Sequence, residues 1–104
     1  MLVSEEFPEL SQELRDLLQK SGDEQLAMQV LGLKLLDRCR CGDDFCATIY
    51  VQPKPVKGYG PSHRNIPLCP EKGMIILDVV EGRIACIEIL YRNDIRTKLL
   101  ALLP

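Results

Sequence analysis

The chain has 104 residues and a mass of 11.8 kDa, enough for one domain with a modest core but too little for two independent cores. Hydrophobic residues make up 46% of the chain and charged residues 27%, as in soluble globular domains rather than disordered or fibrous chains. The formal net charge of -2 argues against a general nucleic-acid binder and against a protein that binds anionic membranes.

The pattern of residues 1–31 predicts an acidic helical segment. Leucines recur at helical spacing over residues 8–20. Asp23 can cap a second helix over residues 24–31, although the alternating apolar residues there also fit the start of a strand. The segment lacks the basic residues and long apolar run of a secretory signal, so we expect a cytoplasmic protein whose thiols stay reduced.

The middle of the chain predicts a hairpin followed by a loop. Residues 32–52 hold β-rich runs on both sides of a turn at Gly42, which is typical of a first hairpin. Residues 53–72 carry the sole histidine, His63, among prolines and glycines, and this composition predicts a long irregular loop. Loops of this length in compact domains are usually functional or mobile.

Residues 73–91 predict a second hairpin around Glu81 and Gly82. A two-residue connection would place Asp78 among apolar side chains, whereas a three-residue connection collects a wholly apolar face, so we expect the latter register. That face would hold Ile75, Leu77, Val79, Ala85, Ile87, Ile89 and Tyr91.

A C-terminal helix is predicted over residues 93–103, with Asn93 or Asp94 as its cap. Together these elements predict a single α+β domain. Its mostly antiparallel sheet of about four strands, made by the two hairpins, packs against the N-terminal and C-terminal helices.

The turn that reads Cys39-Arg40-Cys41-Gly42 precedes the hydrophobic hairpin over residues 73–90. In this combination the chain resembles a group of small uncharacterised bacterial proteins, in which a C-x-C-G hairpin precedes a second hydrophobic hairpin. The resemblance implies a bacterial source and this order of hairpins, and it implies no activity.

Five cysteines in 104 residues raise the question of a metal or redox site. Cys39, Cys41 and Cys46, with Cys69 or His63 as the fourth ligand, would offer soft donors for tetrahedral zinc. The C-x-C spacing is uncommon in such sites, and strand alternation would place Cys39 and Cys41 on one face and Cys46 on the other. We therefore expect most of the cysteines to be buried structural thiols, with no cofactor.

No arrangement in the sequence predicts an active site, so we expect a protein without catalytic activity. His63 could activate Cys69, but a solvent-exposed loop histidine is the commoner case. Asp78 and Glu88 could form an acid–base pair on one sheet face, but such acids are more often matched by arginines. The arginines available for this are Arg38, Arg40, Arg83 and Arg92.

The charges are divided unevenly between the two ends of the chain. Residues 1–31 hold seven acids and two bases, whereas residues 32–104 hold eight acids and eleven bases. An acidic face can steer and mask a basic partner, which favours an immunity protein that occludes a cognate toxin, such as a basic nuclease. We expect the contacts to come from Glu5, Glu6, Glu9, Glu13, Asp16, Asp43 and Asp44.

The alternative is a zinc-binding or thiol-redox module that uses Cys39, Cys41, Cys46 and Cys69. Chelator-dependent thiol reactivity distinguishes these two classes of protein.

Overall fold

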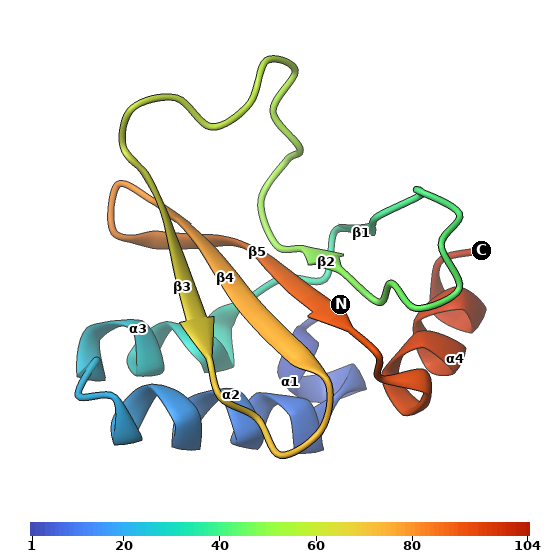
Figure 1. Ribbon diagram of the computed structural model, residues 1–104, viewed down its shortest axis with the longest axis horizontal. Helices are drawn as coiled ribbons and strands as arrows, with labels where there is room; N and C mark the ends of the chain where they lie inside the picture. The colour runs from blue at the N-terminus through green and yellow to red at the C-terminus, as the bar shows by residue number, and fades with distance from the viewer.

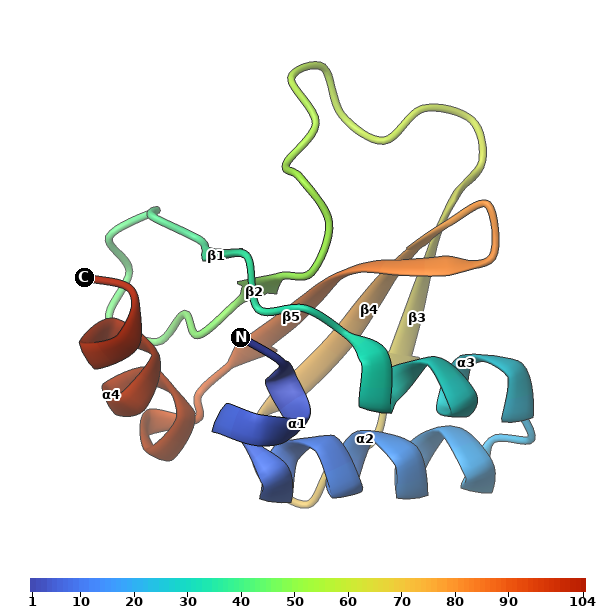
Figure 2. The same ribbon diagram turned by 180° about the vertical axis from the view of Figure 1, so that it is seen from behind.

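Helices from the first third of the chain cover one face of a sheet (Figures 1 and 2). In the computed structural model, which describes all residues from 1 to 104, α1 spans Val3–Glu6, α2 spans Pro8–Lys20 and α3 spans Glu24–Gln29. A 3₁₀ turn, η1, follows at Val30–Gly32. The carboxylate of Asp23 accepts a hydrogen bond from the N–H of Leu26 at 3.1 Å, so the predicted cap is confirmed.

Five strands form one antiparallel sheet in the order β1-β2-β5-β4-β3. The predicted α+β class is therefore confirmed, with one strand more than expected. The strands are β1 at Asp37–Arg38, β2 at Ile49–Tyr50, β3 at His63–Leu68, β4 at Met74–Val80 and β5 at Arg83–Leu90. We call the face that packs on α2 and α3 the inner face and the opposite face the outer face.

The strand β3 lies within residues 53–72, so the prediction of a wholly irregular loop there is wrong. β3 pairs with β4 from His63 opposite Val80 to Leu68 opposite Ile75. It contains Pro67, which is tolerated because β3 is an edge strand of the sheet. Residues 51–62 alone form the irregular connection, which arches away from the sheet between β2 and β3 (Figure 1).

Both predicted hairpins are present, with changes in length and register. The first is reduced to the two pairs of β1 and β2. In the second, the expected register holds from Met74 to Asp78, but a bulge lets Val79 pair with Ile84. Ile84 therefore takes the core position that we expected for Ala85. Tyr91, also expected in the core, is 61% exposed.

Leucines of α2 and aliphatic residues of the inner sheet face form the main core. The last helix, α4, spans Asn93–Leu102 and adds Ile95 and Leu99 to it, although its cap is Arg92 rather than Asn93 or Asp94. None of the helices combines the length and apolar character needed to cross a membrane. Fully buried members of the core include Leu14, Leu18, Ile49, Ile75, Leu77, Ile87 and Ile89.

Candidate functional site

The outer face of the sheet carries a row of polar side chains on three neighbouring strands. Tyr50 of β2 pairs with Cys86 of β5, and Cys86 pairs with Asp78 of β4. Residues paired across strands project from the same face. Cys86 is 2% exposed and Asp78 is 5% exposed, so neighbouring groups shield this part of the outer face from solvent.

Three cysteines converge beside this row, at the edge of the sheet made by β1. The Sγ atoms of Cys39, Cys41 and Cys46 all lie within 4.8 Å of one another. This arrangement contradicts the expectation that strand alternation separates Cys39 and Cys41 from Cys46. The N–H of Cys39 still donates to the carbonyl oxygen of Thr48 at 3.0 Å, but residues 40–45 form a loop, so strand alternation does not determine where Cys41 lies relative to Cys46.

A tight turn brings the thiols together. Gly42 adopts a φ of 83°, in the left-handed region that glycine enters without strain. The N–H of Cys46 donates to the carbonyl oxygen of Asp43 at 3.3 Å, and Cys46 also forms an antiparallel bridge with Leu90 at the end of β5. One side of the loop is therefore fixed to the sheet.

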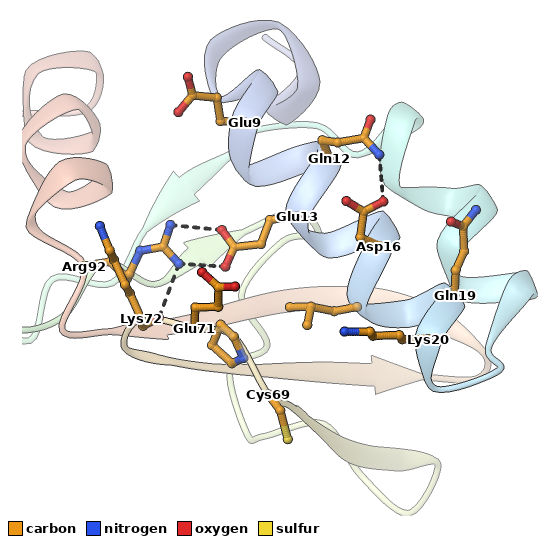
Figure 3. Close-up of a pocket in the computed structure, with 12 residues that line it drawn as sticks. Glu9, Gln12, Glu13, Asp16, Gln19, Lys20, Cys69, Glu71, Lys72 and Arg92 are labelled. Carbon is orange, nitrogen blue, oxygen red and sulfur yellow. Dashed lines mark hydrogen bonds and ion pairs between the residues drawn. The ribbon is translucent and has the colours of Figure 1, made fainter.

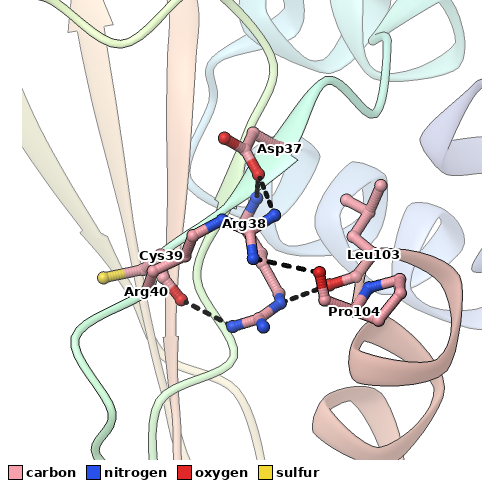
Figure 4. A network of polar contacts seen from close by, with 6 residues as sticks. All are labelled: Asp37, Arg38, Cys39, Arg40, Leu103 and Pro104. Atoms are coloured by element: carbon pink, nitrogen blue, oxygen red, sulfur yellow. Dashed lines mark hydrogen bonds and ion pairs between the residues drawn. The ribbon is translucent and has the colours of Figure 1, made fainter.

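Arginines fix the other side of the loop to the end of the chain (Figure 4). Arg38 donates hydrogen bonds to the carbonyl oxygens of Leu103 and Cys39, and Arg40 donates to that of Pro104 at 3.1 Å. The sulfur of Cys39 points away from these contacts. The arginines thus hold the backbone of the loop and leave the thiol free.

The thiol cluster lowers the pKa of Cys46. Burial raises this pKa, but hydrogen bonds from Thr48 and from the thiols of Cys41 and Cys39 stabilise the thiolate and outweigh burial. A backbone hydrogen bond at Asp43 lowers the pKa of Cys41, but Cys39, desolvation and Cys46 together outweigh it and raise this pKa to about 11. Cys46 therefore loses its proton more readily than Cys41.

The spacing of the sulfurs fits a thiolate-bound metal ion. Sulfurs bound at about 2.3 Å to one tetrahedral Zn²⁺ lie about 3.8 Å apart, so sulfurs within 4.8 Å of one another need to move by only about 1 Å. Cys41 is exposed and can move by this amount. No fourth His, Cys, Asp or Glu side chain joins the group, which leaves one coordination position without a ligand from these residue types.

Neither predicted fourth ligand reaches the cluster. β3 lies at the edge of the sheet opposite β1, and it begins at His63 and ends just before Cys69. The suggested Cys69–His63 pair is also wrong, because six residues of strand span about 20 Å. Of the five cysteines only Cys86 is buried, so the expectation of mostly buried thiols is wrong as well.

His63 belongs to a second polar group on the outer face. Its Nε2 lies 2.6 Å from Asp78 Oδ1, and its ring centroid lies 4.8 Å from that of Tyr59. Burial and a hydrogen bond with Asp78 raise the pKa of Glu88 to about 7, although the charge of His63 opposes this shift. The pKa of Cys86 is raised by burial and by the charges of Asp78 and Glu88.

This group corrects two expectations about the titratable residues. His63 is not a solvent-exposed loop residue, since it lies on β3 and its side chain is 27% exposed. The carboxylate of Asp78 is paired with this histidine rather than with an arginine. Arg92 binds Glu13 instead. The sequence carries a signal for this contact: Asp78 lies within the apolar run of β4, and a buried carboxylate needs a polar partner.

The acidic face of α2 borders an open cleft of about 990 Å³ that faces the connection between β3 and β4 (Figure 3). Arg92 binds Glu13 through both carboxylate oxygens at 2.9 Å, and Asp16 accepts a hydrogen bond from Gln12 at 2.9 Å. Glu9 has no ion-pair partner. The acidic side chains at the cleft are Glu9, Glu13, Asp16 and Glu71, and the basic ones are Lys20, Lys72 and Arg92.

The acids that we expected to contact a partner lie on separate surfaces. Glu5 and Glu6 end α1, and the acids of α2 follow them. Asp43 and Asp44 lie instead in the cysteine-containing loop beside α4 (Figures 1 and 2). The structure thus keeps the acidic helices together and separates this loop from them.

Comparisons of the chain with known protein families, with curated proteins and with solved structures found no match.

Proposed function

We propose that this protein binds a thiophilic divalent metal ion, with Zn²⁺ as the physiological candidate, through Cys39, Cys41 and Cys46. The observation that carries this proposal is the convergence of their Sγ atoms within 4.8 Å of one another. Thiolates are the preferred protein ligands of such ions, and the lowered pKa of Cys46 favours its thiolate form. Metal binding would then displace the protons of the other two thiols.

The number of cysteines in the cluster supports an accessible ion rather than an enclosed structural one. Structural zinc sites have four protein ligands, whereas sites with three protein ligands keep a position for water or another exogenous molecule. Cys41 is exposed, so solvent reaches the cluster. The protein would act as a binder of an exchangeable ion, or would present that ion to a ligand.

The test is a titration of free thiols with an aromatic disulfide in the presence and absence of a chelator. With bound metal, chelation is expected to make Cys39, Cys41 and Cys46 more reactive. The exposed Cys69 lies outside the cluster, so Cys69→Ser is a matched control that should keep the chelator effect. Cys41→Ser should weaken the effect. Equal thiol reactivity with and without the chelator would contradict the proposal.

The cleft along α2 favours a second candidate, an immunity protein that occludes a basic toxin. Glu9, Asp16 and Glu71 line this cleft, and none of them has an ion-pair partner within the chain. They are available to complement a basic surface. If the purified product of the neighbouring gene binds the wild type and a Glu9→Lys/Asp16→Lys variant equally well, at low and at high salt, this candidate is wrong.

A further inference from the structure

A pocket of about 300 Å³ opens on the outer face of the sheet, between residues 51–62 and the turn of the second hairpin. Its size lies at the lower end of the range for small-molecule sites. Val80 and Ala85 line it from β4 and β5, and prolines of the irregular connection line it from the other side. The full lining is Gln52, Pro53, Pro55, Gly58, Tyr59, Val80, Arg83 and Ala85.

Arg83 gives this pocket its charge. It is exposed, and no carboxylate of the chain lies within ion-pair distance of it. Arg83 pairs with Val80, and Val80 pairs with His63, so all three lie in one row across the outer face. A guanidinium without a partner beside an apolar pocket is suited to a carboxylate, which it can bind through two parallel hydrogen bonds.

Tyr59 forms a wall of the pocket that the protein holds in place. Its side chain is half-buried, and its ring packs on His63 with centroids 4.8 Å apart. His63 is fixed in turn by Asp78 at 2.6 Å, and Asp78 is 5% exposed. A wall that is ordered before a ligand arrives lowers the entropy cost of binding.

We propose that this pocket binds a small organic carboxylate, whose apolar body packs against Tyr59 and Val80 while Arg83 holds its carboxylate. His63 and Asp78 are positioning residues for Tyr59. The site is independent of the thiol cluster, because none of the three clustered cysteines lines the pocket. The pocket can therefore bind its ligand even if the protein binds no metal.

The test is a titration of isotope-labelled full-length protein, followed by backbone amide NMR signals, with three probes. Benzoate is expected to shift the signals of Tyr59, Val80 and Ala85, with a Kd on the order of 1 mM, as for a small fragment. Benzamide has nearly the same shape without the charge and should bind at least about tenfold more weakly. Inorganic phosphate carries charge without the apolar body and should not shift these signals.

Two arginine variants distinguish binding in the pocket from nonspecific attraction of an anion to a positively charged surface. Arg83→Gln should weaken benzoate binding about tenfold or more. Arg64→Gln is the matched control, because Arg64 is an exposed arginine outside the pocket, and it should bind benzoate as the wild type does. The proposal is overturned if benzoate causes no shifts at these residues, if phosphate or benzamide binds equally well, or if Arg83→Gln leaves the affinity unchanged.

Discussion

Cys46 and Cys86 show how position on the sheet sets the chemistry of a thiol. Cys46 is half-buried in a cluster whose hydrogen bonds stabilise its thiolate. Cys86 is buried beside Asp78 and Glu88, and both burial and these negative charges raise its pKa. The protein therefore holds one thiol with a lowered pKa and one with a raised pKa.

We predict that iodoacetamide modifies Cys46 well before Cys86 in protein from which metal has been removed. The thiolate is the reacting species, so the lowered pKa of Cys46 and the raised pKa of Cys86 both favour this order. Peptide mass spectrometry after timed labelling checks it, with the exposed Cys69 as an internal marker of reagent activity. Modification of Cys86 at the rate of Cys46 would count against the assigned environments.

Glu88 makes the stability of the protein depend on pH. Its pKa of about 7 in the folded state lies above the ordinary value of 4.5. The folded state therefore holds an extra proton between these pH values, and stability falls as pH rises through this window. Glu88→Gln removes this titration, so the variant should gain stability relative to the wild type between about pH 5 and about pH 7 and keep the gain above that.

The expected gain at pH 8 is on the order of 1 kcal/mol, because solvent screens this partly exposed carboxyl group. Urea unfolding of the wild type and of Glu88→Gln at pH 5 and pH 8 measures it. An equal difference in the free energy of unfolding at both pH values would show that the effect has another origin.

At the scale of elements, the cysteine-containing loop depends on its contacts with the chain that follows α4. Arg38 joins the carbonyl oxygens of Cys39 and Leu103, and thus ties the loop to the end of the chain. Groups that hydrogen-bond to metal-binding residues and so orient them typically raise metal affinity tenfold to a hundredfold. For the proposed metal site, we expect this support to keep the thiols within reach of one ion.

We predict that Arg38→Ala lowers zinc affinity about tenfold without preventing folding. Competition with a chromogenic chelator measures the affinity. Arg64→Ala is the matched control, since Arg64 is exposed on the opposite edge strand and should leave the affinity unchanged. Identical zinc affinity for Arg38→Ala and the wild type would show that the contact with Leu103 does not position the thiols.

Elements with local signals were predictable from the sequence. The leucine spacing of α2, the Asp23 cap and the second hairpin all appear where local patterns place them. β3 was missed because Pro67 and polar residues hide its strand character, and its pairing with β4 is a long-range contact. A strand of this kind is stabilised by its neighbour rather than by its own propensity.

The thiol cluster could be proposed from the sequence, but its convergence could not be predicted. The argument from alternation assumed a continuous hairpin, whereas β1 stops at Arg38 and the left-handed Gly42 reverses the chain. The contact between His63 and Asp78 was equally hidden, because it depends on the register of β3 against β4. Both arrangements depend on contacts between segments that are distant in the sequence, so local patterns do not predict them.

For the whole molecule, the core and the thiol cluster are made of separate residues. The core is one group of 22 buried hydrophobic residues, and it contains none of the five cysteines. The fold should therefore survive removal of the metal. A ligand that binds only the folded state adds stability according to its concentration relative to its Kd.

We predict that chelation lowers the Tm by about 10 °C while the far-ultraviolet circular dichroism at 25 °C stays unchanged. Thermal unfolding with and without a chelator measures both quantities. Loss of the circular dichroism signal on chelation at 25 °C would mean that the cluster is required for folding, in disagreement with the separate core.

The most direct measurement of the central claim is a Co²⁺ titration of metal-free protein, with the bound ions counted by native mass spectrometry. The account predicts one ion per chain and an intense thiolate-to-cobalt absorption band in the wild type and in Cys69→Ser. In Cys46→Ser that band should be strongly reduced. No thiolate band in the wild type, or equal bands in Cys46→Ser and Cys69→Ser, would contradict a metal site at Cys39, Cys41 and Cys46.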